Sequence, residues 1–227
     1  MLSVENPVLL TVPGIVQLPT NARLGLDTST AIRAVNRQNW DLLYIDYIQD
    51  AETLALVMQE ALTGQVVTTM HLKDAISMLL TIREWGAKSL ILGDVVALIT
   101  AQRLVRRLCT NCREPQELTP ADREFIDRIY NLHGYSPDPA EFYTSTGCDS
   151  CHDGFRGRIG IFESLSPSSQ LESALNEGAA YSTLRQSALR AGMETICLDG
   201  IRKAAAGITS LTEIRRVTSD LVELGSS

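Results

Sequence analysis

The chain has 227 residues, 44% of them apolar, and a formal net charge of −7 at neutral pH. This composition is enough for a folded core and excludes an intrinsically disordered chain. No region is strongly basic, so a nucleic-acid-binding surface is not expected. The best candidate for a membrane span, Leu90 to Ala101, is too short and is broken by Asp94. The N-terminus lacks the basic start of a signal peptide, and we therefore expect a soluble, cytosolic protein that does not span a membrane.

The first 46 residues predict strands and one helix. Turn residues and apolar runs place these elements at Val8–Val12, Ile15–Leu18 and, for the helix, about 27–38. A buried strand, Asp41–Asp46, follows and has a carboxylate at its carboxyl end. In open α/β sheets ligands bind at this end of the strands, so Asp46 is a candidate site residue.

The same alternation continues to about residue 107. Asp50 can begin a helix that ends at Gly64, and Val66–Met70 is predicted as a second buried strand with His71 at its carboxyl edge. A helix to Trp85 and a longer one over about 88–107 are predicted next. Strand, helix, strand and helix at this spacing indicate half of a parallel α/β sheet.

Four cysteines form two pairs with metal-ligand spacing. Cys109 and Cys112 flank Thr-Asn, and Cys148 and Cys151 flank Asp-Ser. Two such pairs can supply a closed, tetrahedral zinc site, which would be structural because it leaves no position for water. Two redox dithiols, two disulfides or four unrelated thiols are the alternatives, but the doubled spacing and a reducing compartment favour zinc. Cys197 is predicted to be a buried, inert thiol.

The last part of the chain is predicted as one strand followed by helices. Arg158 to Ser164 alternates as a strand, the pattern is helical from about Ser168, and Thr209-Ser210 with Glu213 predicts a capping box. Domain boundaries are expected near residues 108, 158 and 168. A group of arginines is expected to serve an ion-pair or subunit contact, with a solvated face as the alternative: Arg103, Arg106, Arg107 and Arg113.

Several stretches together resemble the hexameric ATPases of type II secretion and type IV pilus assembly. They are Ala101–Cys109, Gly154–Glu163, Leu62–Gly64 leading to Thr69–His71, and Asp199–Lys203 leading to Ala206–Ser210. The match runs from about Val4 to Thr218. It implies a partial RecA-like parallel sheet over 1–108, a tetracysteine zinc subdomain over 109–158, and a strand plus a C-terminal helical subdomain over 159–227.

The family's catalytic positions are altered in this sequence. Asn6 replaces the Asp of the acidic Glu-Asp-Pro box and lacks its charge. The Walker B strand, which in the family ends Gly-Glu, ends here in Asp46 and Tyr47. Tyrosine has a pKa of about 10 and is a poor base at neutral pH, while Asp46 faces the opposite side of a strand. His71 is retained, but Leu72-Lys73 replaces the Thr-Asn that follows it in the family.

The resemblance also bears on nucleotide binding. Arg33 and Arg37 match family arginines and, with Asp46, are implied to be vestigial nucleotide-binding residues, while Gln49 replaces another arginine. No glycine is followed by lysine, so the P-loop that we expect before Glu5 is not in this sequence. We therefore expect no catalytic residues, structural zinc as the cofactor, and ATP with magnesium only where a partner or an upstream segment supplies a P-loop.

The resemblance implies a C-terminal segment or a degenerate paralogue of the motor ATPase, inactive by itself. The expected partners are secretion or pilus ATPase subunits in a homo- or hetero-oligomer, and inner-membrane platform proteins. The expected location is the cytoplasm, including a peripheral position at the inner membrane. A zinc-stabilised adaptor or interaction module with no motor role is the alternative. We also expect either oligomers or a sheet edge covered by residues 8–18.

Overall fold

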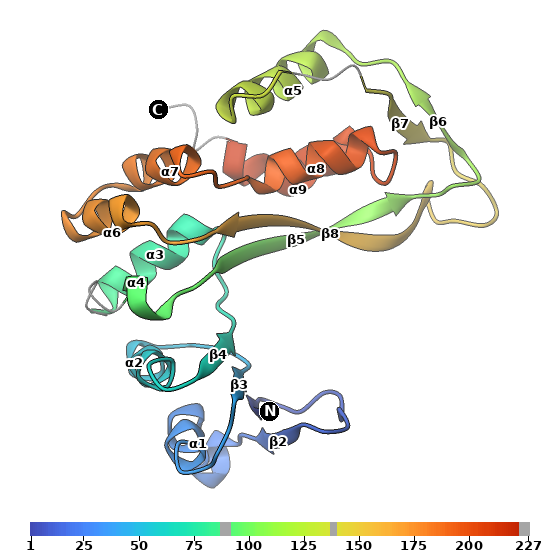
Figure 1. Ribbon diagram of the computed structural model, residues 1–227. Coiled ribbons are helices and arrows are strands. Elements are labelled where there is room, and N and C mark those ends of the chain that lie inside the picture. Colours follow the sequence, from blue (N-terminus) through green and yellow to red (C-terminus); the bar gives the residue numbers. More distant parts are fainter. Residues whose placement is uncertain (87–91, 137–139, 223–227) are drawn as a thin grey trace. The chain divides into compact units, whose positions relative to one another are not determined.

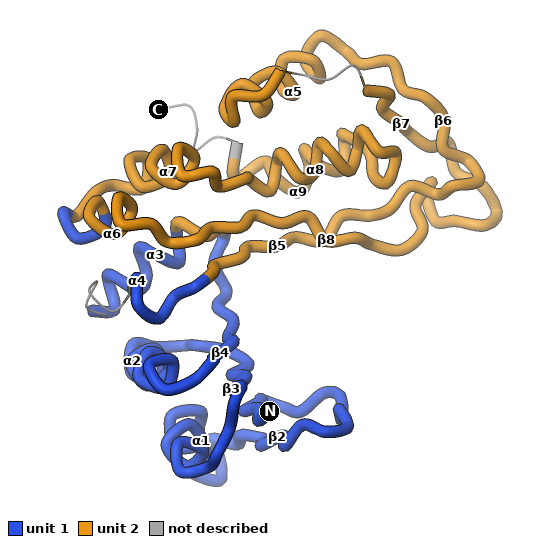
Figure 2. Tube along the Cα trace, in the orientation of Figure 1, with its two compact units in different colours: residues 1–73, 77–97, 175–177 blue, residues 74–76, 98–174, 178–227 orange. Residues whose placement is uncertain are grey.

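The computed structural model describes residues 1–86, 92–136 and 140–222, and the chain divides into two compact units (Figure 2). Unit 1 contains residues 1–73, 77–97 and 175–177, and unit 2 contains residues 74–76, 98–174 and 178–227. Among the described residues, no helix is long and apolar enough to cross a membrane.

Unit 1 is built on a four-stranded parallel sheet with the strand order β2-β1-β3-β4 (Figure 1). Its elements are β1 (Leu2–Glu5), β2 (Val16–Pro19), the 3-10 helix η1 (Ala22–Leu24), α1 (Thr28–Val35), β3 (Leu42–Ile45), α2 (Ala51–Glu60), β4 (Gln65–Thr68), most of α3 (Ala75–Glu84) and α4 (Leu92–Val95). The central strands bury Val4, Leu43 and Ile45. The predicted strands that end at Asp46 and before His71 are confirmed as β3 and β4.

The prediction of a strand at Val8–Val12 is wrong, because the first strand is Leu2–Glu5 and residues 8–12 form a loop. The side chain of Gln17 holds this loop: it accepts from the Val12 amide at 2.8 Å and donates to the Leu10 carbonyl at 2.9 Å. Leu10 is 76% exposed, so its apolar run does not mark a buried strand. The later strand, β2, does pair with β1 and covers one of its edges.

The helix predicted over 88–107 is confirmed only for the short α4, Leu92–Val95, and is wrong from residue 99 onward. Residues 99–108 form the strand β5, while residues 88–91 lie outside the described residues. In β5, Ile99 and Val105 are buried and Leu104 between them is exposed, which is the two-residue period of a strand. A short apolar run cannot be assigned by periodicity alone, and here pairing with a distant strand decides its conformation.

Unit 2 contains two antiparallel strand pairs and a group of helices. Its elements are β5 (Ile99–Leu108), β6 (Arg113–Gln116), α5 (Pro120–Leu132), β7 (Phe142–Ser145), β8 (Phe155–Leu165), most of α6 (Ser169–Asn176), α7 (Tyr181–Arg190), α8 (Ile196–Ala205) and α9 (Leu211–Val222). β5 pairs with β8, and β6 pairs with β7. Helices α8 and α9 run along the β5–β8 ribbon (Figure 1), and a single core joins them to it and to α5.

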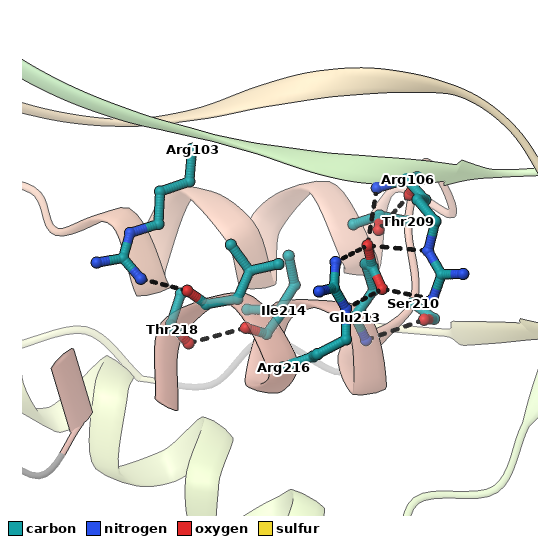
Figure 3. A network of polar contacts seen from close by, with 9 residues as sticks. Arg103, Arg106, Thr209, Ser210, Glu213, Ile214, Arg216 and Thr218 are labelled. Carbon is teal, nitrogen blue, oxygen red and sulfur yellow. Dashed lines mark hydrogen bonds and ion pairs between the residues drawn. The ribbon is translucent and has the colours of Figure 1, made fainter. Parts of the chain in front are cut away.

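The first residues of α9 close the free edge of β5. The Glu213 carboxylate accepts from the Arg106 amide at 3.1 Å and forms ion pairs with the guanidinium groups of Arg106 and Arg216, at 2.8 and 2.7 Å (Figure 3). Ser210 caps the helix by accepting from the Glu213 amide. The ion-pair role predicted for the arginine cluster is thus confirmed for Arg106, and Arg103 pairs with Asp220 at 2.6 Å.

Two side chains of α8 close the free edge of β8. Asp199 accepts from the Phe162 amide at 2.8 Å, and Lys203 donates to the Gly160 carbonyl at 2.8 Å. Unpaired strand edges invite pairing with other chains, so helix side chains protect this two-stranded ribbon on both sides. Cys197, also on α8, is 3% exposed, which confirms the predicted burial of this thiol.

Candidate functional site: an altered strand-end cavity and a four-cysteine cluster

A cavity of about 210 Å³ lies in unit 1, where the parallel strands end. Its lining includes four residues that the sequence analysis assigned to family site positions: Asn6, Asp46, Tyr47 and His71. They come together because they follow the carboxyl ends of β1, β3 and β4, which lie side by side. The sequence therefore places these four residues in one site.

Asp46 is held by groups from all three of these strands. Its Oδ1 accepts from the Tyr44 hydroxyl at 3.2 Å, and its Oδ2 accepts from the backbone N–H of Asn6 at 3.4 Å. Its carbonyl oxygen accepts from the Thr69 hydroxyl. Burial, followed by the charge of Asp46, raises the pKa of Tyr44, so the phenol remains a hydrogen-bond donor at neutral pH.

The ring of Tyr47 lies against the imidazole of His71, with the ring centroids 4.4 Å apart and the planes at 50°. Tilted aromatic pairs at this distance attract each other. The phenol has no carboxylate to orient a water molecule at this position, and Gln49 beside it is neutral.

The charges at the cavity are unfavourable for a polyphosphate. The two acidic lining residues are Glu5 and Asp46, and no described lining residue is lysine or arginine. Glu5 is fixed by hydrogen bonds from the Ser3 hydroxyl at 2.5 Å and from the Gln17 amide at 2.8 Å. Phosphoryl transfer requires cationic groups that neutralise the phosphates, and these residues do not supply them.

The two predicted arginines lie elsewhere. Arg33 on α1 forms an ion pair with Glu52 on α2 at 2.6 Å. Arg37 is exposed just after α1. Neither is among the described residues that line the cavity.

Sequence reasoning missed three hydroxyl groups of the cavity: those of Thr20, Thr28 and Thr69. Thr69 directly follows β4, so the strand-end rule that selects Asp46 and His71 could also have selected it. Thr28 is the first residue of α1, a position where polar groups face the helix terminus. Nothing local in the sequence marks Thr20.

The four paired cysteines of unit 2 form one cluster. All four Sγ atoms lie within 4.8 Å of one another. Three of the separations are 3.9 Å for Cys109 and Cys148, 3.8 Å for Cys112 and Cys151, and 3.7 Å for Cys148 and Cys151. Zinc–sulfur bonds of about 2.3 Å in a regular tetrahedron require sulfurs about 3.8 Å apart. The cluster therefore fits a tetrahedral metal ion with four sulfur ligands.

Two turns and a strand end bring the cysteines together. Cys109 follows β5, and its amide donates to the Gly154 carbonyl at 2.9 Å, which ties it to the turn before β8. The Cys148 amide donates to the Cys151 sulfur at 3.2 Å. Gly154 has φ +82°, and a Cβ there would lie 1.9 Å from the Ser145 hydroxyl oxygen, so only glycine fits this turn.

One thiol of the cluster has a lower pKa than an ordinary cysteine and loses its proton more readily. A hydrogen bond from the Asn111 backbone lowers the pKa of Cys109 to about 7. Desolvation instead raises the pKa of Cys112 to about 12. Metal binding by such a cluster must displace protons and is therefore pH-dependent.

Comparison with known proteins identifies the family. The family model described as "Type II/IV secretion system protein" matches residues 1–216. The chain is 33% identical over 222 residues to the type II secretion system ATPase E of Vibrio cholerae, covering 97% of this chain and 43% of that protein. It is 34% identical over 221 residues to the type IV pilus assembly ATPase PilB of Pseudomonas aeruginosa, covering 95% of this chain and 38% of that protein.

Solved structures share the fold. The pilus retraction motor PilT with bound ADP matches with a TM-score of 0.65 at 16% identity, covering 100% of this chain and 55% of that one. The ATPase DotB of Legionella pneumophila matches with a TM-score of 0.61 at 16% identity, covering 96% of this chain and 51% of that one. These matches and the parallel sheet confirm the predicted α/β, RecA-like fold class. The chain spans less than half the length of the two curated relatives, and it belongs to the type II/IV secretion system protein family.

Proposed function

We propose that this chain is a part of a type II secretion or type IV pilus assembly motor that does not hydrolyse ATP by itself. The observation that carries the proposal is the contact of Tyr47 with His71 in the cavity, at the position where the family resemblance places a catalytic glutamate. The contact supports a structural role for this strand end, because a phenol held against an imidazole cannot replace a carboxylate as a base.

The other groups of the cavity support the same proposal. Asn6 brings a neutral amide where the resemblance places an acid, and the Asp46 carboxylate accepts hydrogen bonds from the protein itself. The lining carries two acids and no lysine or arginine among its described residues. These substitutions argue against ATP turnover whether or not further residues precede this sequence.

The four-cysteine cluster would hold one structural zinc ion. A closed set of four thiolates supplies fold stability and leaves no position for an activated water. Cys109 and Cys112 would bind from the end of β5, and Cys148 and Cys151 from the turn before β8. Coordination of one ion by these four sulfurs would lock the ends of the long β5–β8 ribbon together.

As partners we propose the P-loop-bearing ATPase subunits of the same machine and its inner-membrane platform proteins. The location would then be the cytoplasm, including the inner face of the membrane. The test is copurification of the tagged, zinc-loaded chain with such an ATPase, followed by turnover measurements on the complex. We expect a complex whose ATP turnover is unchanged by Asp46→Ala in this chain. Turnover that falls with Asp46→Ala would contradict the proposal, and stable complexes without any ATPase subunit would indicate an adaptor.

A further inference from the structure

The β5–β8 ribbon of unit 2 has one buried face and one exposed face. Val105 and Ile161 point into the core that the ribbon shares with α8 and α9, and each is 0% exposed. Side chains alternate along a strand, so Leu104 and Phe162 lie on the opposite face, where they are 57% and 43% exposed. Because side chains of α8 and α9 close the strand edges, a partner chain meets this ribbon more readily on its exposed face than by adding a strand.

Phe162 makes part of the exposed face flat and apolar. Its ring lies over Gly160, since a Cβ at Gly160 would be 2.6 Å from Cζ of the ring. The strand register places Leu104 opposite Gly160, and the Lys203 ammonium lies 5.1 Å from the centroid of the ring. A ring that lies against its own strand offers a surface for a partner's side chain, whereas insertion into a lipid surface requires apolar side chains that project from the protein.

The ribbon also concentrates positive charge in an acidic chain. Residues 99–108 contain three arginines and residues 155–162 contain two, and neither stretch contains an acidic residue. The whole chain, in contrast, has a net charge of −7. Ion pairs with α9 compensate two of these arginines, Arg103 and Arg106. The other three are left for a partner from outside the ribbon.

These three arginines lie at the end of the ribbon near the cysteines. Arg107, Arg156 and Arg158 are exposed, and their side chains have no hydrogen-bond or ion-pair partner among the described residues. Arg158 shares the exposed face with Phe162, four residues along the strand, and is directly opposite Arg106 in the register. Like charges directly opposite each other destabilise a strand pair. Such a placement does not serve the fold and is typical of a functional surface.

We propose that the exposed face of the β5–β8 ribbon is a docking surface for an acidic segment of a partner protein. Carboxylates of the segment would pair with Arg107, Arg156 and Arg158, and an apolar side chain of the segment would pack against Leu104 and Phe162. Guanidinium groups bind carboxylates through two parallel hydrogen bonds, which would fix the position of the segment along the ribbon. The proposal concerns unit 2 alone and does not depend on whether the chain hydrolyses ATP.

A polypeptide segment fits this surface better than other polyanions. A net charge of −7 repels a nucleic acid or an anionic membrane at long range, and three arginines are few to overcome that repulsion. A short segment carries much less charge. The mixture of apolar and cationic side chains across only two strands also matches a segment that carries both carboxylates and an apolar residue.

The test uses the full, zinc-loaded chain and a synthetic probe. The probe is a short peptide of glutamates with one central leucine, and its matched control has glutamines in place of the glutamates. Backbone amide signals of β5 and β8 would be followed by NMR during each titration. We expect the glutamate peptide to cause saturable shifts that are confined to the ribbon and weaken as salt is added, and the glutamine peptide to cause none.

Variants assign the binding to the named side chains. Arg158→Gln should weaken binding of the glutamate peptide about threefold, the usual effect of one exposed ion pair. The triple variant with glutamine at Arg107, Arg156 and Arg158 should show no saturable binding, and Leu104→Ser should bind more weakly than the unmodified chain. Arg123→Gln, on the exposed face of α5, is the matched control and should change nothing. Arg158→Gln should not lower the free energy of unfolding, as the loss of a structural arginine would.

Equal binding of the glutamate and glutamine peptides would overturn the proposal, as would a triple variant that keeps its full affinity. Binding to phosphatidylglycerol vesicles without binding to the glutamate peptide would assign the face to a membrane. Self-association of the chain that disappears in the triple variant, measured by sedimentation, would assign the face to a second copy. Either of these last two results would also contradict the proposed partner.

Discussion

The phenol ring of Tyr47 and the imidazole of His71 are in contact, with centroids 4.4 Å apart. A carboxylate in place of the phenol would put a charge beside the imidazole, whereas the present pair is held by ring packing. The two rings follow different strands, β3 and β4, so their contact joins the ends of neighbouring strands. The contact thereby joins two of the strand ends that line the cavity.

Restoring the acid alone should therefore not create an ATPase. We expect Tyr47→Glu, even together with Asn6→Asp, to give no phosphate release in these 227 residues, because no described residue of the cavity lining is a lysine or arginine that could neutralise the phosphates. Fusion of a P-loop-bearing N-terminal half from a relative should restore nucleotide binding with little turnover.

Adding Tyr47→Glu to that fusion should raise turnover by roughly 10²-fold or more, the usual contribution of a positioned base. Tyr47→Phe in the same fusion is the control, since it keeps the ring and supplies no base. Equal turnover by the unmodified fusion and the Tyr47→Glu fusion would show that position 47 does not limit catalysis.

The cysteine cluster should contain one zinc ion per chain by elemental analysis, with sulfur-only ligation by X-ray absorption. Cys109→Ser should lose most of the metal and loosen residues 109–151 first, because metal-binding free energy is local folding free energy. Amide exchange checks the location of the change. Cys197→Ala is the matched control, since this buried thiol is outside the cluster. Protein purified gently and found free of metal would refute the zinc assignment.

Glu213 should make the protein sensitive to acid. Burial opposes ionisation, but hydrogen bonds from Arg216 and Arg106 lower the pKa of Glu213 to about 2 from 4.5 (Figure 3). A carboxyl group whose pKa is lower in the folded than in the unfolded protein stabilises the fold. The stabilisation is complete above the pKa of the unfolded state and is lost as pH falls from about 4.5 towards 2. The shift corresponds to roughly 3 kcal/mol of unfolding free energy at neutral pH.

Urea unfolding at pH 6 and pH 3 would measure this contribution. Glu213→Gln should lower the free energy of unfolding at pH 6 and flatten its fall towards pH 3. Glu124→Gln, on the exposed face of α5, should change neither. A variant at Glu213 that retains the full acid sensitivity would contradict the role of this ion-pair group.

Gly64 should not tolerate a side chain. A Cβ at this position would lie 2.4 Å from Cζ3 of Trp40, closer than any packed contact allows. We expect Gly64→Ala to destabilise the protein by about 1–3 kcal/mol, measured by thermal or urea unfolding. Trp40→Leu should relieve part of the cost in the double variant. Additive losses in the double variant would show that the tryptophan is not the cause.

The local sequence pattern was sufficient to predict those parts of the fold that depend on residues close together in the chain. The strands before Asp46 and His71 are short apolar runs that end in polar residues, and the strand-end rule places both side chains in one cavity. The doubled cysteine spacing likewise predicts the four-sulfur cluster. In each case residue type and sequence spacing carry the information.

Long-range contacts decide what the sequence pattern could not. Residues 99–108 have an apolar content that suits either a helix or a strand, and pairing with β8 makes them a strand. Glu163 accepts a hydrogen bond from the amide of Ala75, 88 residues away, and no local motif encodes this contact. Arg33 lies outside the described cavity lining and forms an ion pair with Glu52 on the next helix, a contact that the sequence pattern does not encode.

The measurement that tests the central claim most directly is steady-state phosphate release by the purified 227-residue chain, loaded with zinc and supplied with magnesium and ATP. We predict no release above the buffer background, and the same result for Asp46→Ala. Release that follows the protein through purification and disappears with Asp46→Ala would contradict the account, because the cavity would then bind and activate the phosphates that its charges are expected to repel.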